Sequence, residues 1–251
     1  MRTKSFIAVM ILSISSTTIA QEKKKPDKKD TPRVAVVLPL GVVPGKTAKL
    51  AIRGRKLADA TAVRFKNGRI TAKIVSKGAA PVPDKNPDKV GDTQVVVEAA
   101  IPGDVAGNLD FVVVTPAGES KPHMLLVETR LPVIAEKEPN EGFRQAQPVK
   151  LPVVIEGSID RQRDVDVFRF EGKAGQKIVI EVLAARHGSA LDSIVTLYDA
   201  AGQQIASSDD TKDGLDSRLD VVLPATGVYH IALIDAHDSG GPIHVYRLLA
   251  R

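Results

Sequence analysis

The 251-residue sequence holds 35 Lys and Arg against 30 Asp and Glu, is 43% hydrophobic and contains no cysteine. A chain of this length can form one or two domains with buried cores. Without cysteine it has neither disulfides nor thiolate metal sites, so an exported domain must depend on packing, oligomerisation or a bound metal.

The net charge of +5 is spread unevenly along the chain. Residues 1–20 carry +2 and residues 21–33 carry +3, so the remainder is neutral. Within that remainder, residues 34–135 have fourteen basic and nine acidic residues, whereas residues 136–251 have thirteen and eighteen. The second half is therefore net negative, which favours a metal or a polycation as its ligand and excludes nucleic acid as the expected partner.

Residues 1–20 are predicted to be a secretory signal peptide. A short basic start, "MRTK", precedes the apolar stretch "SFIAVMILSI", and small residues lead to a cleavage site after Ala20. The apolar stretch is too short to span a bilayer and no later one is long enough, so we expect a secreted, periplasmic or cell-surface protein with no membrane span. The Lys-rich leader at 21–32 is predicted to be disordered, acting as a solvated spacer or attaching to an anionic surface.

Residues 33–130 show short alternating runs broken by Gly and Pro. In "AKLAIRG", Ala48, Leu50 and Ile52 fall on one face of a strand, and "TQVVVEAAIP", "LDFVVVTPAG" and "HMLLVE" have the same period of two. This pattern predicts an antiparallel β-sandwich. The stretch 77–92 contains three prolines and no apolar period, so we expect a surface excursion there.

A second β series follows an expected acidic linker at 131–150. Residues 151–251 contain eight strand-like runs separated by Gly, Pro, Asp and Ser: "VVIEGSID", "DVDVFRFEG", "QKIVIEVLA", "SIVTLYD", "QQIASS", "SRLDVVLP", "GVYHIALID" and "IHVYRLLA". They predict a second sandwich of jelly-roll type. The expected fold class is all-β, with two consecutive antiparallel β-sandwich domains.

The first half resembles an IPT/TIG-type immunoglobulin-like domain. The resemblance is carried by "LPLGVVPGKTAKLAIRGRKL" and by "VVVTPAGES", which contains Thr115, Pro116, Gly118 and Ser120. It implies an immunoglobulin-like sandwich over 33–130 and says little about function.

The second half is similar to the bacterial pre-peptidase C-terminal domain. "EPNE", "GSIDRQRDVDVFRFEGKAGQ", "LYDAAGQQIASSDD" and "DSRLDVVLPATGVYHIALID" follow that family's order and approximate spacing. The resemblance implies a secreted, non-catalytic sandwich that is usually appended to proteases or other exported hydrolases. In some members it binds calcium and a macromolecular substrate.

Oxygen-bearing side chains gather where the two halves meet. Hard cations such as calcium take six to eight oxygen ligands, and an extended segment places alternate residues on the same side. The resemblance implies that the linker acids and an Asp pair enclose the metal together, and it gives the predicted ligands as Glu136, Glu138, Asn140, Glu141, Asp164 and Asp166. Family members usually have Asp where this chain has Glu141.

Two interpretations of these acids remain open. In one, calcium orders residues 136–141 against the Asp pair and fixes the angle between the domains. In the other, the acids form a solvated linker with ordinary ion pairs. Arg161 and Arg163 flank Asp164 and Asp166 and could neutralise them. Without metal the acids repel one another, and the first interpretation predicts an extended, mobile hinge.

Other polar groups carry weaker signals. The group Asp209, Asp210, Asp213 and Asp216 lacks EF-hand spacing and favours a turn over a metal site. The five histidines show no zinc-site spacing and are expected to be solvated or to lie at a rim. There is no G-x-S-x-G motif, and the sequence context of the serines does not resemble that of a protease.

The leading hypothesis is a secreted, non-catalytic accessory protein stabilised by calcium. Its expected partners are an extracellular polymer, a cell-surface component or a secreted hydrolase. The alternatives are a part of or accessory to a secreted peptidase or hydrolase, and a purely structural surface spacer.

Overall fold

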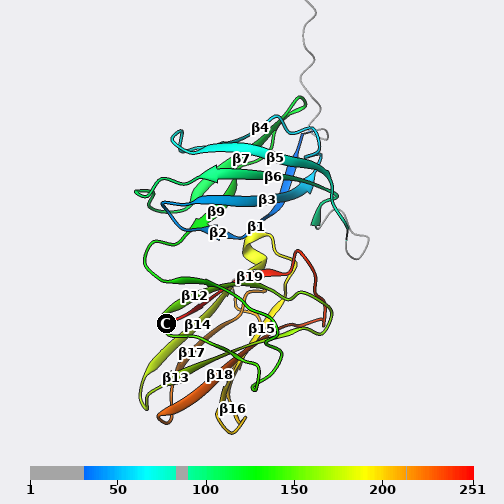
Figure 1. Cartoon of the computed structure of the whole chain (residues 1–251). Helices are drawn as coiled ribbons and strands as arrows, with labels where there is room; N and C mark the ends of the chain where they lie inside the picture. The colour runs from blue at the N-terminus through cyan, green and yellow to red at the C-terminus, as the bar shows by residue number, and fades with distance from the viewer. Residues whose placement is uncertain (1–30, 83–89, 213) are drawn as a thin grey trace, which may run out of the picture.

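The computed structural model describes residues 31–82, 90–212 and 214–251, and their strands form four sheets (Figure 1). Two sheets belong to the first half of the chain and two to the second. The first half contains β1 (Arg33–Leu38), β2 (Gly41–Val42), β3 (Thr47–Arg55), β4 (Ala62–Phe65), β5 (Thr71–Ala79), β6 (Thr93–Ala100), β7 (Leu109–Thr115), β8 (Gly118–Glu119) and β9 (His123–Val127). The second half contains β10 (Val133–Ala135), β11 (Gln147–Pro148), β12 (Val153–Ser158), β13 (Val165–Gly172), β14 (Lys177–Leu183), β15 (Ser193–Asp199), β16 (Gln204–Ser208), β17 (Arg218–Val222), β18 (Gly227–Asp235) and β19 (Val245–Ala250), together with the 3-10 turn η2 (Ala185–His187).

The first sandwich packs the sheet β1-β3-β6-β5 against the sheet β2-β9-β7-β4, with β8 paired to β7. Alternation along β3 buries Leu50 and Ile52, as the period of two predicts. They share one core with Val95 and Val97 of β6 and Phe111 of β7.

The second sandwich pairs the sheet β10-β12-β19-β14-β17 with the sheet β11-β13-β18-β15-β16. All eight strands predicted for residues 151–251 are present. Ile178 and Ile180 of β14 face Tyr229 and Ile231 of β18 within one buried core. The predicted fold class, all-β with two sandwiches built mainly from antiparallel pairs, is confirmed.

The stretch predicted to be an acidic linker differs from that expectation, because it is part of the second sandwich. β10 pairs in parallel with β12, and β11 pairs in parallel with β13, so one short segment extends both sheets. Gln147 also ties the two ends of the segment together, since its side chain accepts from the Lys137 amide at 2.7 Å and donates to the Ala135 carbonyl at 3.0 Å. An extended, mobile hinge at 136–141 is therefore not what the structure shows.

The predicted surface excursion at 77–92 also differs in part. β5 continues to Ala79, and Val90 is buried where the two halves meet. Val90 is buried although the stretch is rich in proline, because its burial removes apolar surface from water. Residues 83–89 lie outside the described part of the chain, as do the predicted signal peptide and most of the predicted leader.

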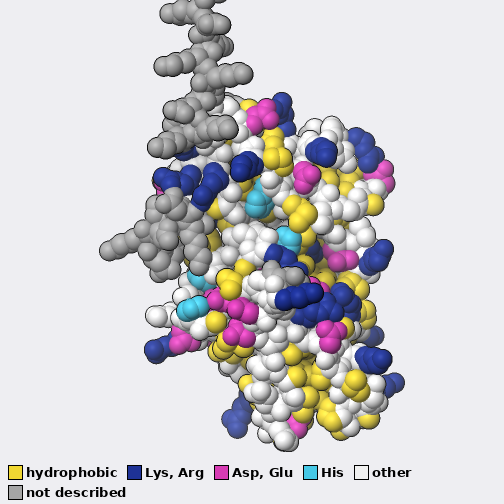
Figure 2. Space-filling view, turned by 180° about the vertical axis from the view of Figure 1, so that it is seen from behind, with side chains coloured by type: hydrophobic (Ala, Val, Ile, Leu, Met, Phe, Trp, Pro, Cys, Tyr) yellow, Lys and Arg dark blue, Asp and Glu magenta, His cyan; other side chains and the backbone are white. Residues whose placement is uncertain are grey.

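The two sandwiches are stacked end to end, with β1, β2 and β9 of the first facing η2 and the start of β19 of the second (Figure 1). Lys and Arg side chains are spread over both sandwiches on the face drawn in Figure 2. Among the described residues, no helix is long and apolar enough to cross a membrane.

Candidate metal site

The candidate site lies where β10 ends and β13 begins. Glu136 directly follows β10, and its backbone amide donates to the Glu156 carbonyl at 2.8 Å. The chain then runs along the edge of β13, where the Val167 amide donates to the Asn140 carbonyl at 3.0 Å. The expected linker is thereby held against the strand that carries Asp166.

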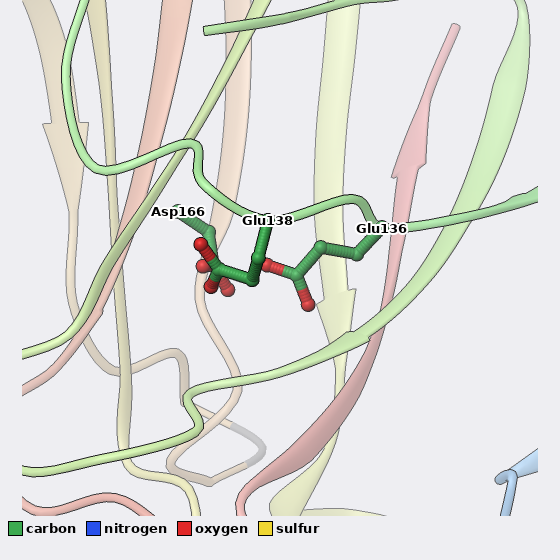
Figure 3. A group of neighbouring side chains, drawn as sticks. All are labelled: Glu136, Glu138 and Asp166. Atoms are coloured by element: carbon green, nitrogen blue, oxygen red, sulfur yellow. The ribbon is translucent and has the colours of Figure 1, made fainter. Parts of the chain in front are cut away.

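Three carboxylates converge in this position. One oxygen from each of Glu136, Glu138 and Asp166 lies within 4.8 Å of the others, and the three side chains point toward one another (Figure 3). Asp166 is completely buried, whereas Glu138 is exposed at the rim. Two distant segments of the chain therefore build one acidic pocket, which we define as Glu136, Glu138, Asn140, Asp164 and Asp166.

Several oxygens of the acidic pocket are buried without a hydrogen-bond donor. Within the described residues, these are Oδ1 of Asn140, Oδ1 of Asp164 and Oδ1 of Asp166. The Asn140 amide nitrogen donates to Glu136 at 2.9 Å, which fixes the opposite oxygen as the unpartnered one. Oδ1 of Asp164 makes no hydrogen bond but has the Arg161 guanidinium 3.3 Å away. Buried acceptors usually have donors, so the two remaining oxygens, of Asn140 and Asp166 beside Glu136, are the mark of a missing electropositive ligand.

The remaining oxygens are held by the protein. Oδ2 of Asp164 accepts from the Asp160 amide at 2.7 Å, and Oε2 of Glu136 accepts from the Ser158 amide at 2.9 Å. The hydroxyl of Tyr246 donates to Oδ2 of Asp166 at 2.7 Å. Each of these carboxylates therefore has one oxygen fixed by the fold.

Electrostatics in the acidic pocket disfavour several negative charges at once. Burial raises the pKa of Asp166 to about 10, and the neighbouring Glu136 adds to the effect through a hydrogen bond and its charge. Burial and the charge of Asp164 raise the pKa of Glu138 as well. The pocket without a cation therefore keeps a proton on Asp166 at neutral pH.

Glu141 is placed differently from the other predicted ligands. It forms an ion pair with Arg161, which also lies 3.3 Å from Oδ1 of Asp164. The carboxylate of Glu141 is not one of the three that converge. Arg161 thus holds Glu141 at the rim and also reaches Asp164, one of the Asp pair that the ion-pair alternative expected it to neutralise.

Tyr246 and Ser158 are parts of the site that sequence reasoning missed. Tyr246 lies on β19, eighty positions after Asp166, and no local motif links the two. Gly157, which pairs with Tyr246, leaves the space that both the Tyr246 hydroxyl and Glu136 enter, since a Cβ there would lie 2.4 Å and 2.3 Å from them. Only the pairing of β12 with β19 brings these groups together.

The donor set of the acidic pocket fits a hard cation. All of its side chains offer oxygen, and the two oxygens without a partner come from an amide, Asn140, and a carboxylate, Asp166, which are ligand types that calcium takes in proteins. A bound cation would also offset the repulsion between Glu136, Glu138 and Asp166. The residues present therefore fit calcium.

The second acidic group is divided between two roles. Asp216 accepts from the backbone amides of Ala184 and Ala185 at 3.1 Å and 2.6 Å, in agreement with the side-chain-to-backbone role expected for this group. Asp209 and Asp210 instead approach Asp192, a residue that the sequence did not single out. Asp213 lies outside the described residues.

The histidines are less exposed than predicted. His230 and His244 are buried. His230 stacks against Phe143 with ring centroids 4.4 Å apart, so an aromatic ring of the expected linker covers it. His237, which lies 3.4 Å from Asp192, is exposed as predicted.

The geometry defines the second half as a β-sandwich with an acidic pocket at its N-terminal edge. Residues 164–234 match the model of the bacterial pre-peptidase C-terminal domain, which confirms that resemblance for this part of the chain. The match begins at Asp164, so the acids at 136–141 lie before it.

Similar proteins were found by sequence and by structure. The chain is 39% identical over 97 residues to a probable subtilase-type serine protease of Deinococcus radiodurans, a match that covers 38% of this chain and 13% of that protein. The pre-peptidase C-terminal domain of a collagenase from Bacillus anthracis aligns with a TM-score of 0.36 at 19% identity, over 46% of this chain and all of that one. A periplasmic inhibitor of g-type lysozyme from Aeromonas hydrophila, PliG, aligns with a TM-score of 0.33 at 20% identity, over 48% of this chain and 96% of that one.

Proposed function

We propose that this protein is an exported, non-catalytic accessory module whose second sandwich is stabilised by calcium. It acts by binding a cell-surface component, an extracellular polymer or a secreted hydrolase. The first sandwich is an IPT/TIG-like spacer or binding domain in this proposal. The observation that carries the calcium part is the convergence of Glu136, Glu138 and Asp166 beside two buried oxygens without a partner, Oδ1 of Asn140 and Oδ1 of Asp166.

Calcium does not act as a hinge switch in this proposal. The segment 133–148 is paired into both sheets of the second sandwich at its two ends, so the cation holds the stretch between them in place and neutralises the pocket. The contribution of calcium is consequently to stability and order, in a chain that has no disulfides to supply either.

Calorimetry on the protein that lacks residues 1–20 tests the calcium part. We expect one calcium ion to bind, and we expect Asp166→Asn and Glu138→Gln to weaken binding by at least about tenfold, because each removes a charged ligand. Glu171→Gln is the matched control, since Glu171 is an exposed carboxylate on the same strand as Asp166. Absence of binding heat in the parent protein would refute the calcium part.

The sequence similarity to a subtilase-type protease favours a secreted hydrolase as the partner, or as the larger protein to which such a module is attached. Capture from the culture medium on immobilised protein, with calcium and with EGTA, tests this. We expect a hydrolase or an envelope polymer to be retained. If neither is retained, the structural-spacer alternative gains support.

A further inference from the structure

An apolar interface joins the two sandwiches. Val36, Leu40 and Leu126 of the first sandwich form a buried cluster with Ile243 of the second. Leu183, Ala190 and Val245 extend this cluster from the side of the second sandwich. Neither sandwich would keep these side chains from water on its own, so each supplies the cover for the other.

A buried arginine lies at the edge of this interface. Arg247 of β19 is only 3% exposed, and its Nε lies 3.1 Å from Oε1 of Glu156 on the paired strand β12. Glu128, which follows β9 of the first sandwich, also acts on this cation through its charge. A buried guanidinium is costly unless acids and close packing hold it in place, and here both sandwiches contribute to that.

The first sandwich leaves room for Arg247 because residue 41 is a glycine. A Cβ on Gly41 would lie 2.0 Å from Nη1 of Arg247, so the guanidinium occupies the space that any other residue at position 41 would fill. A second close approach lies beside η2, where a Cβ on Gly188 would lie 2.0 Å from the Ala35 carbonyl oxygen. Backbone and side chain thus interlock between the sandwiches at two points.

The strands that hold Arg247 also build the acidic pocket. Tyr246, the neighbour of Arg247 on β19, donates to Asp166. On β12, Glu156 pairs with Arg247, and Ser158 donates to Glu136. The interface and the pocket therefore occupy opposite faces of the same two strands.

We propose that Arg247, seated beneath Gly41, locks the two sandwiches into one rigid unit, and that this lock is coupled through β12 and β19 to cation binding in the acidic pocket. The lock does not depend on a bound cation. Its coupling to cation binding rests on the proposed function. A cation that holds Glu136 and Asp166 against β12 and β19 favours the strand positions that also hold Glu156 and Arg247. Coupling between two sites is reciprocal. The factor by which a bound cation favours the locked arrangement therefore equals the factor by which loss of that arrangement weakens cation binding.

Gly41→Val tests the lock from the first sandwich, at a residue that is not part of the acidic pocket. The matched control is Gly68→Val, because a Cβ on Gly68 meets nothing within 4 Å. The chain has no cysteine, so Lys49→Cys and Lys177→Cys provide one exposed label site on each sandwich for single-molecule energy transfer. In EGTA we expect a single narrow efficiency distribution for the parent and the control, and a broad, shifted one for Gly41→Val.

Arg247→Met provides a second route to the same measurement. It keeps an apolar stem of similar length and removes the guanidinium, so we expect the same broadening as for Gly41→Val. Arg218→Met is its control, since Arg218 also pairs with a glutamate of the second sandwich, Glu181, but lies at the surface. If both Gly41→Val and Arg247→Met keep the narrow distribution, the lock is disproved.

Calcium titration of the same variants tests the coupling. We expect Gly41→Val and Arg247→Met to weaken calcium binding by about five- to tenfold, the lower part of the usual range of coupling between sites, and both controls to leave it unchanged. Unchanged calcium affinity in variants whose distribution has broadened would overturn the coupling. If the parent binds no calcium, the proposed function and the coupling both fail, while the test of the lock in EGTA still gives its own answer.

Discussion

The Tyr246 hydroxyl donates a 2.7 Å hydrogen bond to Asp166, which lies on the opposite sheet of the second sandwich. The bond crosses the end of the core and fixes the buried carboxylate that shares the acidic pocket with Glu136. It therefore connects sheet packing to the candidate metal site.

Tyr246→Phe should destabilise the protein without disturbing its core, because the ring stays and only the buried donor is lost. We expect a loss of about 1–3 kcal/mol in the free energy of unfolding, the usual cost of leaving a buried acceptor unsatisfied. Urea denaturation measures it. Tyr198→Phe, on the outer face of β15, is the control and should change stability by less than about 0.5 kcal/mol.

Calcium binding should release a proton. The pKa of Asp166 is raised to about 10 when no cation is present, so the cation must displace the proton that this carboxyl carries at neutral pH. Affinity should rise by roughly tenfold per pH unit between pH 6 and pH 8. Calorimetry in buffers of different ionisation enthalpy counts the proton, and a binding heat independent of the buffer would contradict this prediction.

Asp166→Asn should stabilise the calcium-free protein at high pH. A carboxyl whose folded pKa lies above its unfolded value binds more protons when folded, so the stability it contributes is present at low pH and declines as pH rises toward 10. The amide removes this decline. At pH 8 in EGTA we expect a gain of about 1–3 kcal/mol over the parent. The gain should disappear in saturating calcium, which only the parent binds tightly.

Mild acid should weaken the junction between the sandwiches. Burial lowers the pKa of His123 and of His187, and the charge of His187 lowers the pKa of His123 further. Around His187, the charges of Arg186 and Arg247 act in the same direction as burial, and that of Asp216 opposes it. A base whose pKa is lowered by folding binds fewer protons in the folded state. The stability of the protein is therefore greatest above pH 6.5, the ordinary pKa of histidine, and decreases as the pH falls below 6.5.

The melting temperature should therefore fall by a few degrees between pH 7 and pH 5.5. His123→Gln should make this fall smaller, because it removes one of the two groups. His237→Gln, at an exposed histidine, should leave the profile of the parent unchanged. Differential scanning calorimetry gives both curves, and identical slopes in all three proteins would rule out the histidine pair.

Phe143→Trp should report on cation binding. Phe143 stacks on His230 and contacts Tyr198 at 5.3 Å between ring centroids, and it lies three residues after Asn140. The chain has no other tryptophan, so the emission of the variant comes from this position alone. We expect calcium to shift the emission because it changes the charge of the acidic pocket next to this ring, and we expect the added Asp166→Asn change to abolish that shift.

The sequence alone predicted the eight strands of residues 151–251 and, in the first sandwich, β3, β6, β7 and β9, because alternation of apolar and polar residues reflects burial of one face of each strand. Ile178, Ile180, Tyr229 and Ile231 are core residues for that reason. Of the six ligands that the family resemblance implied, Glu136, Glu138 and Asp166 do converge, whereas Glu141 does not join them. Local spacing grouped the acids within each half of the pocket, but only the family resemblance joined the two halves into one site.

The remaining features of the fold and the site depend on contacts between residues far apart in the sequence. The pairing of 133–135 with β12 and of 147–148 with β13 turned an expected linker into sheet, and no local pattern records a parallel partner. Tyr246 joined the pocket and Arg247 entered the junction because β19 pairs with β12, a contact between residues about ninety positions apart. Such long-range pairings depend on how the two sheets close over one core, and that closure is determined by the whole chain and not by any short segment of it.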